Sequence, residues 1–262
     1  MMSGVTSFYV SDGPDRFVSQ SSTAGPWGPE SQHGGPPAAL LTRGIEDLAR
    51  DEHRVVGRLT MELLGPVPVG PLRLSAEVVR PGRSVEMCEA MLYDEQRDRA
   101  CARATAWLFP ATDDGPAQDD TPLPHTPEDG VHKDPPASWS GGYLDSVDWR
   151  WVRGAVTEPG PGVVWMRPLV DLVAGEPMSP VQRLMTCVDS ASGVSAALDP
   201  AAWGFLNTEL TVHVLRPPAG EWVCLEAVTT LGSGSVGIAT SHVYDARGLV
   251  ARSAQALLIQ KR

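Results

Sequence analysis

The chain has 262 residues, 42% of them hydrophobic, and a formal net charge of −11 at pH 7. This length suits one large domain or two of about 130 residues, either of which can bury a core. The acidic balance argues against nucleic-acid binding, and an anionic ligand would need a local basic patch. No apolar run approaches the roughly 18 residues of a membrane span, and we expect no signal peptide because the N-terminus lacks a basic flank and an apolar core.

The first half of the chain predicts one helix followed by an antiparallel run of strands. Two weak strand candidates, at 7–10 and 17–18, precede a segment rich in proline and glycine at 24–35. Pro36 and Pro37 suit the first turn of a helix that ends near residue 50. Four strand-like segments follow, at 55–64, 71–80, 84–93 and 99–109.

The second half repeats this order after a linker-like segment at 111–140, which is rich in proline, aspartate and glycine. Its central element is a helix at 178–198, which Ser179 would cap and Pro180 would begin. The spacing of apolar residues predicts one buried face, and Asp189 lies beside it. Strand-like segments flank this helix, at 142–156 and 162–167 before it and at 206–216, 222–231, 235–244 and 249–259 after it.

Residues also recur between the halves, which favours an internal duplication, although any two antiparallel meanders share some likeness. In the best register Thr60 corresponds to Thr211. The other matches are CARATAWLF at 101–109 with VARSAQALLI at 250–259, and Tyr93-Asp94 with Tyr244-Asp245.

The cysteines do not suggest a metal site. Three of them lie in apolar strand-like segments and one lies in the second helix, without metal-like spacing. We therefore expect reduced core thiols and a cytoplasmic protein. The four are Cys88, Cys101, Cys187 and Cys224.

Three polar positions in the second half could carry chemistry. Alternation in the last strand places Gln255 on an apolar face, where an amide needs partners or costs about 1–3 kcal/mol. The duplicated position is Ala106, which suggests that only the second half carries a site. Asp189 could act as a general base on water. Asn207 and Thr208 lie at the start of the strand that follows the second helix. Alternation does not decide which of the two faces the apolar side. Each position has a purely structural alternative. Gln255 could be an ordinary core glutamine, Asp189 a partly exposed helical aspartate, and Asn207 or Thr208 a turn residue.

One loop in the first half could bind substrate. His33, Gly34 and Gly35 precede the first helix, and backbone N–H groups there could bind a carbonyl oxygen or a phosphate. A glycine-rich entry loop is the alternative. The sequence contains no G-x-S-x-G, zinc, P-loop or dinucleotide motif. Ser190 and Ser192 have no adjacent histidine, which disfavours a serine nucleophile.

Three segments carry a family resemblance: QHGGPPAALLTRGIE at 32–46, NTELTVHVLRPPAGEWV at 207–223 and ARGLVARSAQALLI at 246–259. They resemble the double-hotdog acyl-CoA thioesterases, of the acyl-CoA thioesterase II type and its actinobacterial thioesterase-like relatives. The likeness covers nearly the whole chain outside the linker. It implies an α+β fold, the double hotdog, in which two tandem curved antiparallel sheets each wrap around a central helix. We expect an N-terminal hotdog at 1–110, a linker at 111–140 and a C-terminal hotdog with the active site at 141–262.

The resemblance also implies a catalytic set. In this family an aspartate on the second-half helix, a threonine or serine near the start of the next strand and a glutamine in the last strand hold and activate a water. These positions fall on Asp189, Asn207 and Gln255, with Thr208 adjacent to the position where the best-known enzymes carry a hydroxyl. Pro36 is a second departure, because those enzymes carry a glutamine after the Gly-Gly pair.

We therefore expect hydrolysis of an acyl-CoA thioester to a free acid and CoA, with no cofactor or metal because CoA is part of the substrate. Gly34 or Gly35 at the helix N-terminus would stabilise the oxyanion, His33 would line the same substrate site, and Arg216 would meet CoA phosphates. Relatives of this fold associate through sheet edges, so a homo-oligomer is also an expectation.

Two alternatives to hydrolysis stay open. One is a non-catalytic acyl-CoA or acyl-carrier-protein binding protein, which would bind ligand without releasing CoA. The other is a hotdog dehydratase or hydratase. That chemistry usually needs a histidine paired with an acid, and no predicted helix offers an Asp–His pair.

Overall fold

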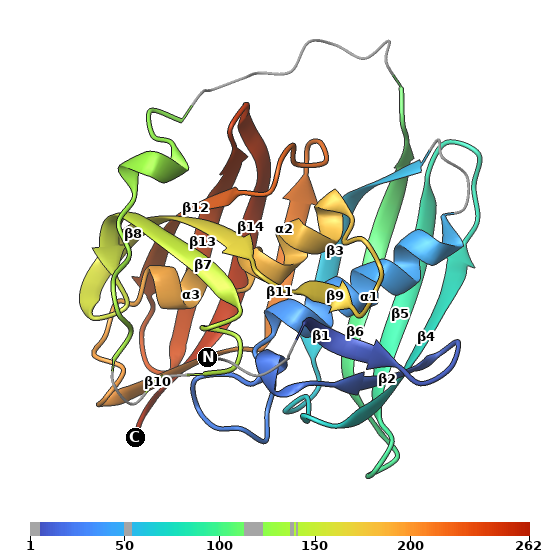
Figure 1. Cartoon of the computed structure of the whole chain (residues 1–262), viewed down its shortest axis with the longest axis horizontal. Coiled ribbons are helices and arrows are strands. Elements are labelled where there is room, and N and C mark those ends of the chain that lie inside the picture. Colours follow the sequence, from blue (N-terminus) through green and yellow to red (C-terminus); the bar gives the residue numbers. More distant parts are fainter. Residues whose placement is uncertain (1–5, 50–53, 113–122, 137–138, 140) are drawn as a thin grey trace.

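Two helices lie in front of one long sheet (Figure 1). The computed structural model describes residues 6–49, 54–112, 123–136, 139 and 141–262. Helix α1 spans Gly35–Leu48, helix α2 spans Pro180–Val188, and the short helix α3 spans Ala191–Val194. No helix among the described residues has both the length and the apolar character needed to cross a membrane.

The described residues form 14 strands that hydrogen-bond into one sheet. The strands are β1 (Ser7–Ser11), β2 (Arg16–Ser19), β3 (Arg54–Leu63), β4 (Pro71–Arg80), β5 (Glu86–Asp94), β6 (Arg99–Pro110), β7 (Val147–Ala155), β8 (Glu158–Pro168), β9 (Asp171–Val173), β10 (Trp203–Asn207), β11 (Glu209–Val214), β12 (Val223–Leu231), β13 (Val236–Asp245) and β14 (Gly248–Lys261). Their order is β7-β8-β12-β13-β14-β11-β3-β6-β5-β4-β2-β1-β9, with β10 paired to β14 beside this path. Neighbours are antiparallel except β1 and β9.

The two halves of the sheet repeat one topology. The order β3-β6-β5-β4 in the first half matches β11-β14-β13-β12 in the second. The halves meet where β3 pairs with β11, and there Thr60 lies opposite Thr211 with their hydroxyl oxygens 3.0 Å apart. Equivalent residues meet in this way at a local two-fold axis. The register also shifts at equivalent places, at Leu92/Tyr93 and Val243/Tyr244.

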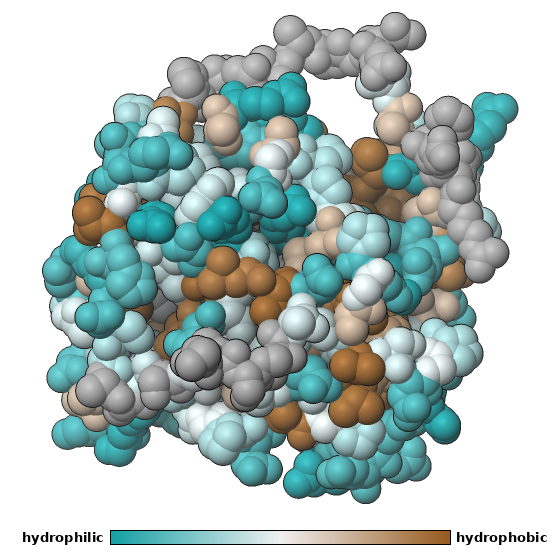
Figure 2. Space-filling model, in the orientation of Figure 1, coloured by the Kyte–Doolittle hydropathy of each residue, from teal (hydrophilic) through white to brown (hydrophobic). Residues whose placement is uncertain are grey.

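Each half of the sheet packs against its own helix, so the predicted double hotdog is confirmed, with the two sheets joined edge to edge. On α1, the side chains of Leu40, Leu41 and Ile45 are fully buried. This helix packs against α2, and among the strands it contacts mainly β4 and β5. In the view of Figure 1 the surface is mostly hydrophilic, with apolar residues in small separate groups (Figure 2). The four cysteines are buried and unpaired, as expected.

The continuous helix predicted at 178–198 is wrong. Helix α2 ends at Val188, and α3 begins three residues later, at Ala191. In an unbroken helix, Ser192 N–H would donate to Val188 and the Asp189 carbonyl would accept from Gly193. Here the Gln255 side chain takes both places, because its Oε1 accepts from Ser192 N–H (3.1 Å) and its Nε2 donates to the Asp189 carbonyl (2.9 Å). A tertiary contact therefore replaces the helical bonds.

The described part of the predicted linker lies along β7. Val131 pairs with Trp151 through two backbone hydrogen bonds of 2.8 and 2.9 Å. Lys133 Nζ donates to the Gly154 carbonyl at 3.0 Å. Residues 113–122, 137–138 and 140 of this segment lie outside the described residues. The domain limits at 110 and 141 stay a prediction.

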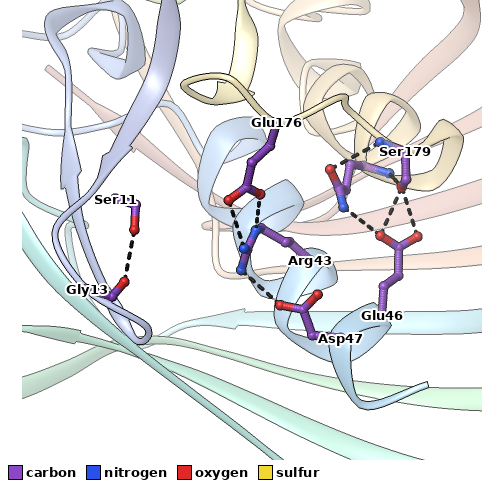
Figure 3. Close-up of polar contacts among 8 residues, drawn as sticks. Ser11, Gly13, Arg43, Glu46, Asp47, Glu176 and Ser179 are labelled. Carbon is purple, nitrogen blue, oxygen red and sulfur yellow. Dashed lines mark hydrogen bonds and ion pairs between the residues drawn. The ribbon is translucent and has the colours of Figure 1, made fainter. Parts of the chain in front are cut away.

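A polar clamp joins α1 to the start of α2 (Figure 3). Glu46 on α1 accepts hydrogen bonds from Ser179 Oγ (2.9 Å) and Gln182 Nε2 (2.7 Å). Ser179 is the N-cap of α2, as the sequence predicts, and it forms a capping box with Gln182. Arg43, one turn before Glu46, donates from Nε to Glu176 at 2.7 Å. Burial raises the pKa of Glu46 above its ordinary value of 4.5, and the two hydrogen bonds only partly oppose this effect.

This raised pKa predicts a pH-dependent contribution to stability. A carboxyl group that binds its proton more tightly in the native state stabilises that state most at low pH. We expect the unfolding free energy of the wild type, relative to Glu46→Gln, to be highest below pH 4.5 and to fall as pH rises through the native pKa. Urea unfolding of both proteins over this range measures the difference. A difference that is constant, or that grows with pH, would contradict the assignment.

Candidate active site

The Asp189 carboxylate is the centre of the site. Asp189 follows the last residue of α2 and is 4% exposed. Its Oδ1 accepts hydrogen bonds from Asn207 Nδ2 at 2.8 Å and from Gln255 Nε2 at 3.1 Å. Its Oδ2 lies 3.4 Å from His33 Nδ1. The structure thus brings together four of the residues that the sequence singles out, from both halves of the chain.

Gln255 is fully buried on the inner face of β14, where alternation predicts it. Its amide contacts both the backbone at the helix break and the Asp189 side chain. The buried amide therefore has the partners that its burial requires. One side chain fixes both the position of Asp189 along the helix and the direction of its carboxylate.

A β-bulge aims Asn207 at the carboxylate. Asn207 pairs with Leu257 while Thr211 pairs with Ala254, so this strand carries one extra residue relative to β14. The extra residue, Thr208, is exposed, and its hydroxyl lies 3.5 Å from the Ala256 carbonyl. Of the two candidates at the strand start, Asn207 contacts Asp189 and the Thr208 hydroxyl lies against β14.

His33 lies between the carboxylate and the start of α1. Its Nδ1 accepts a hydrogen bond from Gly35 N–H at 3.1 Å, and its ring stacks on Tyr143 with centroids 3.8 Å apart. Burial lowers the pKa of His33, and the nearby Asp189 charge only partly opposes this. The neutral ring therefore organises the Gly34–Gly35 backbone. The Tyr143 hydroxyl in turn donates to the Thr186 carbonyl on α2 at 2.7 Å.

The start of α1 and the end of α2 approach so closely that only glycine fits. A Cβ on Gly34 would lie 2.5 Å from Asp189 Oδ2, and a Cβ on Gly35 would lie 2.1 Å from the Thr186 carbonyl oxygen. Gly34 is the N-cap of α1. The positive end of the α1 dipole therefore lies next to the buried carboxylate.

Two pockets meet at Asn207. The first, about 560 Å³ including its mouth, has mostly apolar walls. Its lining includes Trp27, Trp149, Phe205, Leu144, Val156 and Asp189. The second, about 820 Å³ including its mouth, lies on the other side of Asn207 and shares Trp27 with the first. Its lining includes Gln32, Gly34, Gly65, Pro66 and Thr208. Asp189 thus lies where an elongated substrate could pass from one pocket to the other.

Arg216 is not part of this constellation. It follows β11, whereas Asn207 precedes that strand, and six strand residues span roughly 20 Å. Its guanidinium pairs with Asp245, the last residue of β13, with one Nη–Oδ distance of 2.8 Å. Arg99 instead borders the second pocket, because its Nη2 donates to the Pro66 carbonyl at 2.9 Å, and its Nε lies 3.7 Å from Asp94 Oδ2.

Sequence reasoning missed two features of the site. The expectation that no Asp–His pair exists considered residues on one helix, whereas His33 reaches Asp189 from a loop in the other half of the chain. The aromatic pocket walls come from several separate segments and leave no periodic signal. Among the described residues, no group of three or more histidine, cysteine or acidic side chains is placed to hold a metal ion.

Comparisons with known proteins match both halves of the chain. Residues 23–109 match the acyl-CoA thioesterase N-terminal domain, and residues 119–259 match the acyl-CoA thioesterase C-terminal domain. The two matches cover most of the chain, which therefore belongs to the acyl-CoA thioesterase family. No curated protein matches the sequence significantly.

Solved structures show the same fold. A Thermobifida fusca protein whose assignment as a thioesterase II is provisional has a TM-score of 0.75 at 21% identity, covering 99% of this chain and 100% of that one. A hot dog protein of unknown function from Alicyclobacillus acidocaldarius has a TM-score of 0.75 at 18% identity, covering 96% and 95%. The acyl-CoA thioesterase II TesB2 from Mycobacterium marinum has a TM-score of 0.66 at 16% identity, covering 97% and 96%.

Substitutions of Gly34 and Gly35 should have different effects, one on activity and the other on stability. Gly34→Ala should displace only the Asp189 carboxylate and lower kcat/KM about 100-fold, because small misplacements of reacting groups cost about that much. Gly35→Ala meets a backbone oxygen and should destabilise the fold by about 1–3 kcal/mol. Thioester hydrolysis and thermal unfolding of both variants measure this contrast. Full activity of a folded Gly34→Ala variant would show that the carboxylate position does not matter.

Proposed function

We propose that the protein hydrolyses acyl-CoA thioesters by means of a water that Asp189 holds and deprotonates. The supporting observation is the division of labour between the carboxylate oxygens. Oδ1 already accepts from Asn207 and Gln255. Oδ2 faces His33 Nδ1, which accepts from Gly35 and therefore has no proton to donate to Oδ2. The lone pairs of Oδ2 are thus available to a water.

The α1 N-terminus supplies the oxyanion donor in this proposal. Gly35 N–H donates to His33, and Pro36 and Pro37 have no N–H. Gly34 N–H is then the donor of the first turn that can reach a substrate oxygen, and the helix dipole favours negative charge there. This refines the expectation that Gly34 or Gly35 fills the role.

The reaction follows from this arrangement. The Asp189-bound water attacks the thioester carbonyl carbon, its proton passes to Asp189, and the carbonyl oxygen becomes an oxyanion beside Gly34 N–H. Collapse of this intermediate breaks the C–S bond. The CoA sulfur leaves as a thiolate and takes up the proton from Asp189. The products are the free acid and CoA, and the carboxylate is regenerated.

The two pockets suit the two parts of the substrate. The first pocket has mostly apolar and aromatic walls, and its described lining contains no lysine or arginine, so we assign it to the acyl group. The second has more polar walls and is bordered by Arg99, so we assign it to the pantetheine arm and the phosphates of CoA. A protein of net charge −11 needs such a local cation for an anionic substrate.

Three further parts of the proposal come from chemistry and from the sequence. The mechanism uses no cofactor, because CoA arrives as part of the substrate. The buried free cysteines fit a reducing cytoplasm. The homo-oligomer stays a prediction.

Replacing Asp189 by Asn tests the central role. The variant keeps the shape of the side chain but loses the base, and we expect kcat to fall by about 10²–10⁴-fold without loss of the fold. Release of the CoA thiol, followed with a thiol reagent, measures turnover. Burial raises the pKa of Cys187 to about 12, so this protein thiol should not react. Unchanged turnover would refute the role, and a wild type that binds acyl-CoA without releasing CoA would indicate a binding protein.

Two neighbouring substitutions test the third position. Asn207→Ala removes a hydrogen bond to Asp189 and should lower kcat/KM by about 10²–10³-fold, as loss of a preorganised donor does. Thr208→Ala removes an exposed hydroxyl that lines the second pocket and does not contact Asp189, so kcat should change by less than about threefold, near the level of a single weak contact. The same thiol-release assay compares them. A larger loss in Thr208→Ala than in Asn207→Ala would transfer the role to the hydroxyl.

The approach of His33 to Asp189 keeps a hydratase as a second candidate. That reaction needs a histidine and an acid near the substrate, and these two side chains lie 3.4 Å apart. The Gly35 N–H bond to Nδ1 favours a positioning role for His33 instead. Incubation with a 2-enoyl-CoA separates the two. Hydrolysis gives the unsaturated acid and free CoA, whereas hydration gives a 3-hydroxyacyl-CoA with no free thiol.

A further inference from the structure

The acyl pocket ends at an aromatic partition. Phe205 lies on β10, half-buried, and contributes to the wall of the first pocket. On its other side lies a smaller apolar pocket of about 190 Å³, which Phe205 also lines. Its lining is mostly apolar, with Leu198, Leu231, Leu257 and Ile259 beside the hydroxyl residues Ser192 and Thr229, so it favours apolar groups. Phe205 and Ser192 line both pockets, so the Phe205 ring lies between the two spaces.

Trp149 contributes a second aromatic surface to the wall of the first pocket. Trp149 Nε1 donates to the Leu144 carbonyl at 3.0 Å, so the polar atom of the indole is already satisfied. Its ring stacks on Trp151 at 6.4 Å and meets Tyr143 edge-on at 6.1 Å. These contacts hold the ring in one orientation. A flat apolar group gains most from such a surface, because aromatic rings prefer offset stacked or edge-to-face contacts.

From these two observations, and on the basis of the proposed function, we propose that Phe205 sets the acyl specificity of the enzyme. The pocket between Phe205 and Trp149 accepts compact, ring-bearing acyl groups. The Phe205 ring excludes long unbranched chains from the apolar space behind it. In this proposal Phe205 acts through the acyl group alone, because the polar contacts at Asp189 come from other residues.

Selectivity between phenylacetyl-CoA and dodecanoyl-CoA tests this proposal. We expect the wild type to favour phenylacetyl-CoA by at least about tenfold in kcat/KM. Phe205→Ala joins the two apolar spaces, and each additional buried methylene is worth about fourfold. We therefore expect the ratio of dodecanoyl-CoA to phenylacetyl-CoA activity to rise at least about tenfold in this variant. Phe205→Leu, which keeps most of the packing, should shift the ratio in the same direction.

Two comparison variants make the result specific. Phe109→Ala removes an exposed phenylalanine from β6 in the other half, and the ratio should stay at its wild-type value. Gly193 lines the acyl pocket, and a Cβ built there meets no atom within 4 Å. Gly193→Leu, whose Cβ enters open space, should therefore narrow the pocket and lower the activity on phenylacetyl-CoA relative to acetyl-CoA. Thermal unfolding identifies any variant that has lost its fold.

The proposal is overturned if the wild type prefers dodecanoyl-CoA, or if folded Phe205→Ala and Phe205→Leu keep the wild-type ratio. Failure of the proposed function gives a different result, since no acyl-CoA would then be hydrolysed. In that case the thioethers S-phenethyl-CoA and S-dodecyl-CoA replace the substrates, and quenching of tryptophan fluorescence measures their binding. If the wild type binds the phenethyl compound more tightly and Phe205→Ala reverses this preference, the assignment of Phe205 is supported without catalysis. If Phe205→Ala changes the affinity for both compounds equally, the assignment is rejected.

Discussion

The structure depends on one buried carboxylate. Removing an ionised group from water is costly unless hydrogen bonds replace its solvation. Asp189 receives that compensation from two amide side chains, Asn207 on β10 and Gln255 on β14, both of which donate to the same oxygen. Its second oxygen, Oδ2, lies close to Gly34 at the start of α1, which belongs to the other half of the chain. A reactive position is thus held by groups that only the complete fold brings together.

The duplicated fold explains why these groups come together once. The halves share a strand order and meet at the Thr60–Thr211 pair. The first-half position that corresponds to Gln255 is Ala106, which packs in the core. Without an amide there, the first half has no side chain to interrupt a helix, and α1 continues without a break to Leu48. The presence of Ala106 in place of a glutamine therefore accounts for the unbroken helix in the first half.

Much of this arrangement follows from the sequence. Alternation predicts that Gln255 faces the core, helix signals place Ser179 and Pro36 at helix starts, and turn residues separate the strands. The helix break at Asp189 could not be predicted, because its cause is an amide 66 residues away along the chain. The choice between Asn207 and Thr208 needs the β-bulge, which depends on the register with β14 and changes the direction of alternation. Local patterns predict elements, and contacts between residues far apart in the sequence decide the site.

The central claim is that Asp189 activates a water and does not itself attack the thioester. A single turnover in H₂¹⁸O, with enzyme in excess over acyl-CoA, tests this directly by mass spectrometry of both products. Direct attack by water places one ¹⁸O atom in the released acid and leaves the peptide that contains Asp189 unlabelled. Attack by the carboxylate would form an anhydride, and its hydrolysis at the aspartyl carbon would place the label in that peptide. Label in the Asp189 peptide would contradict the account.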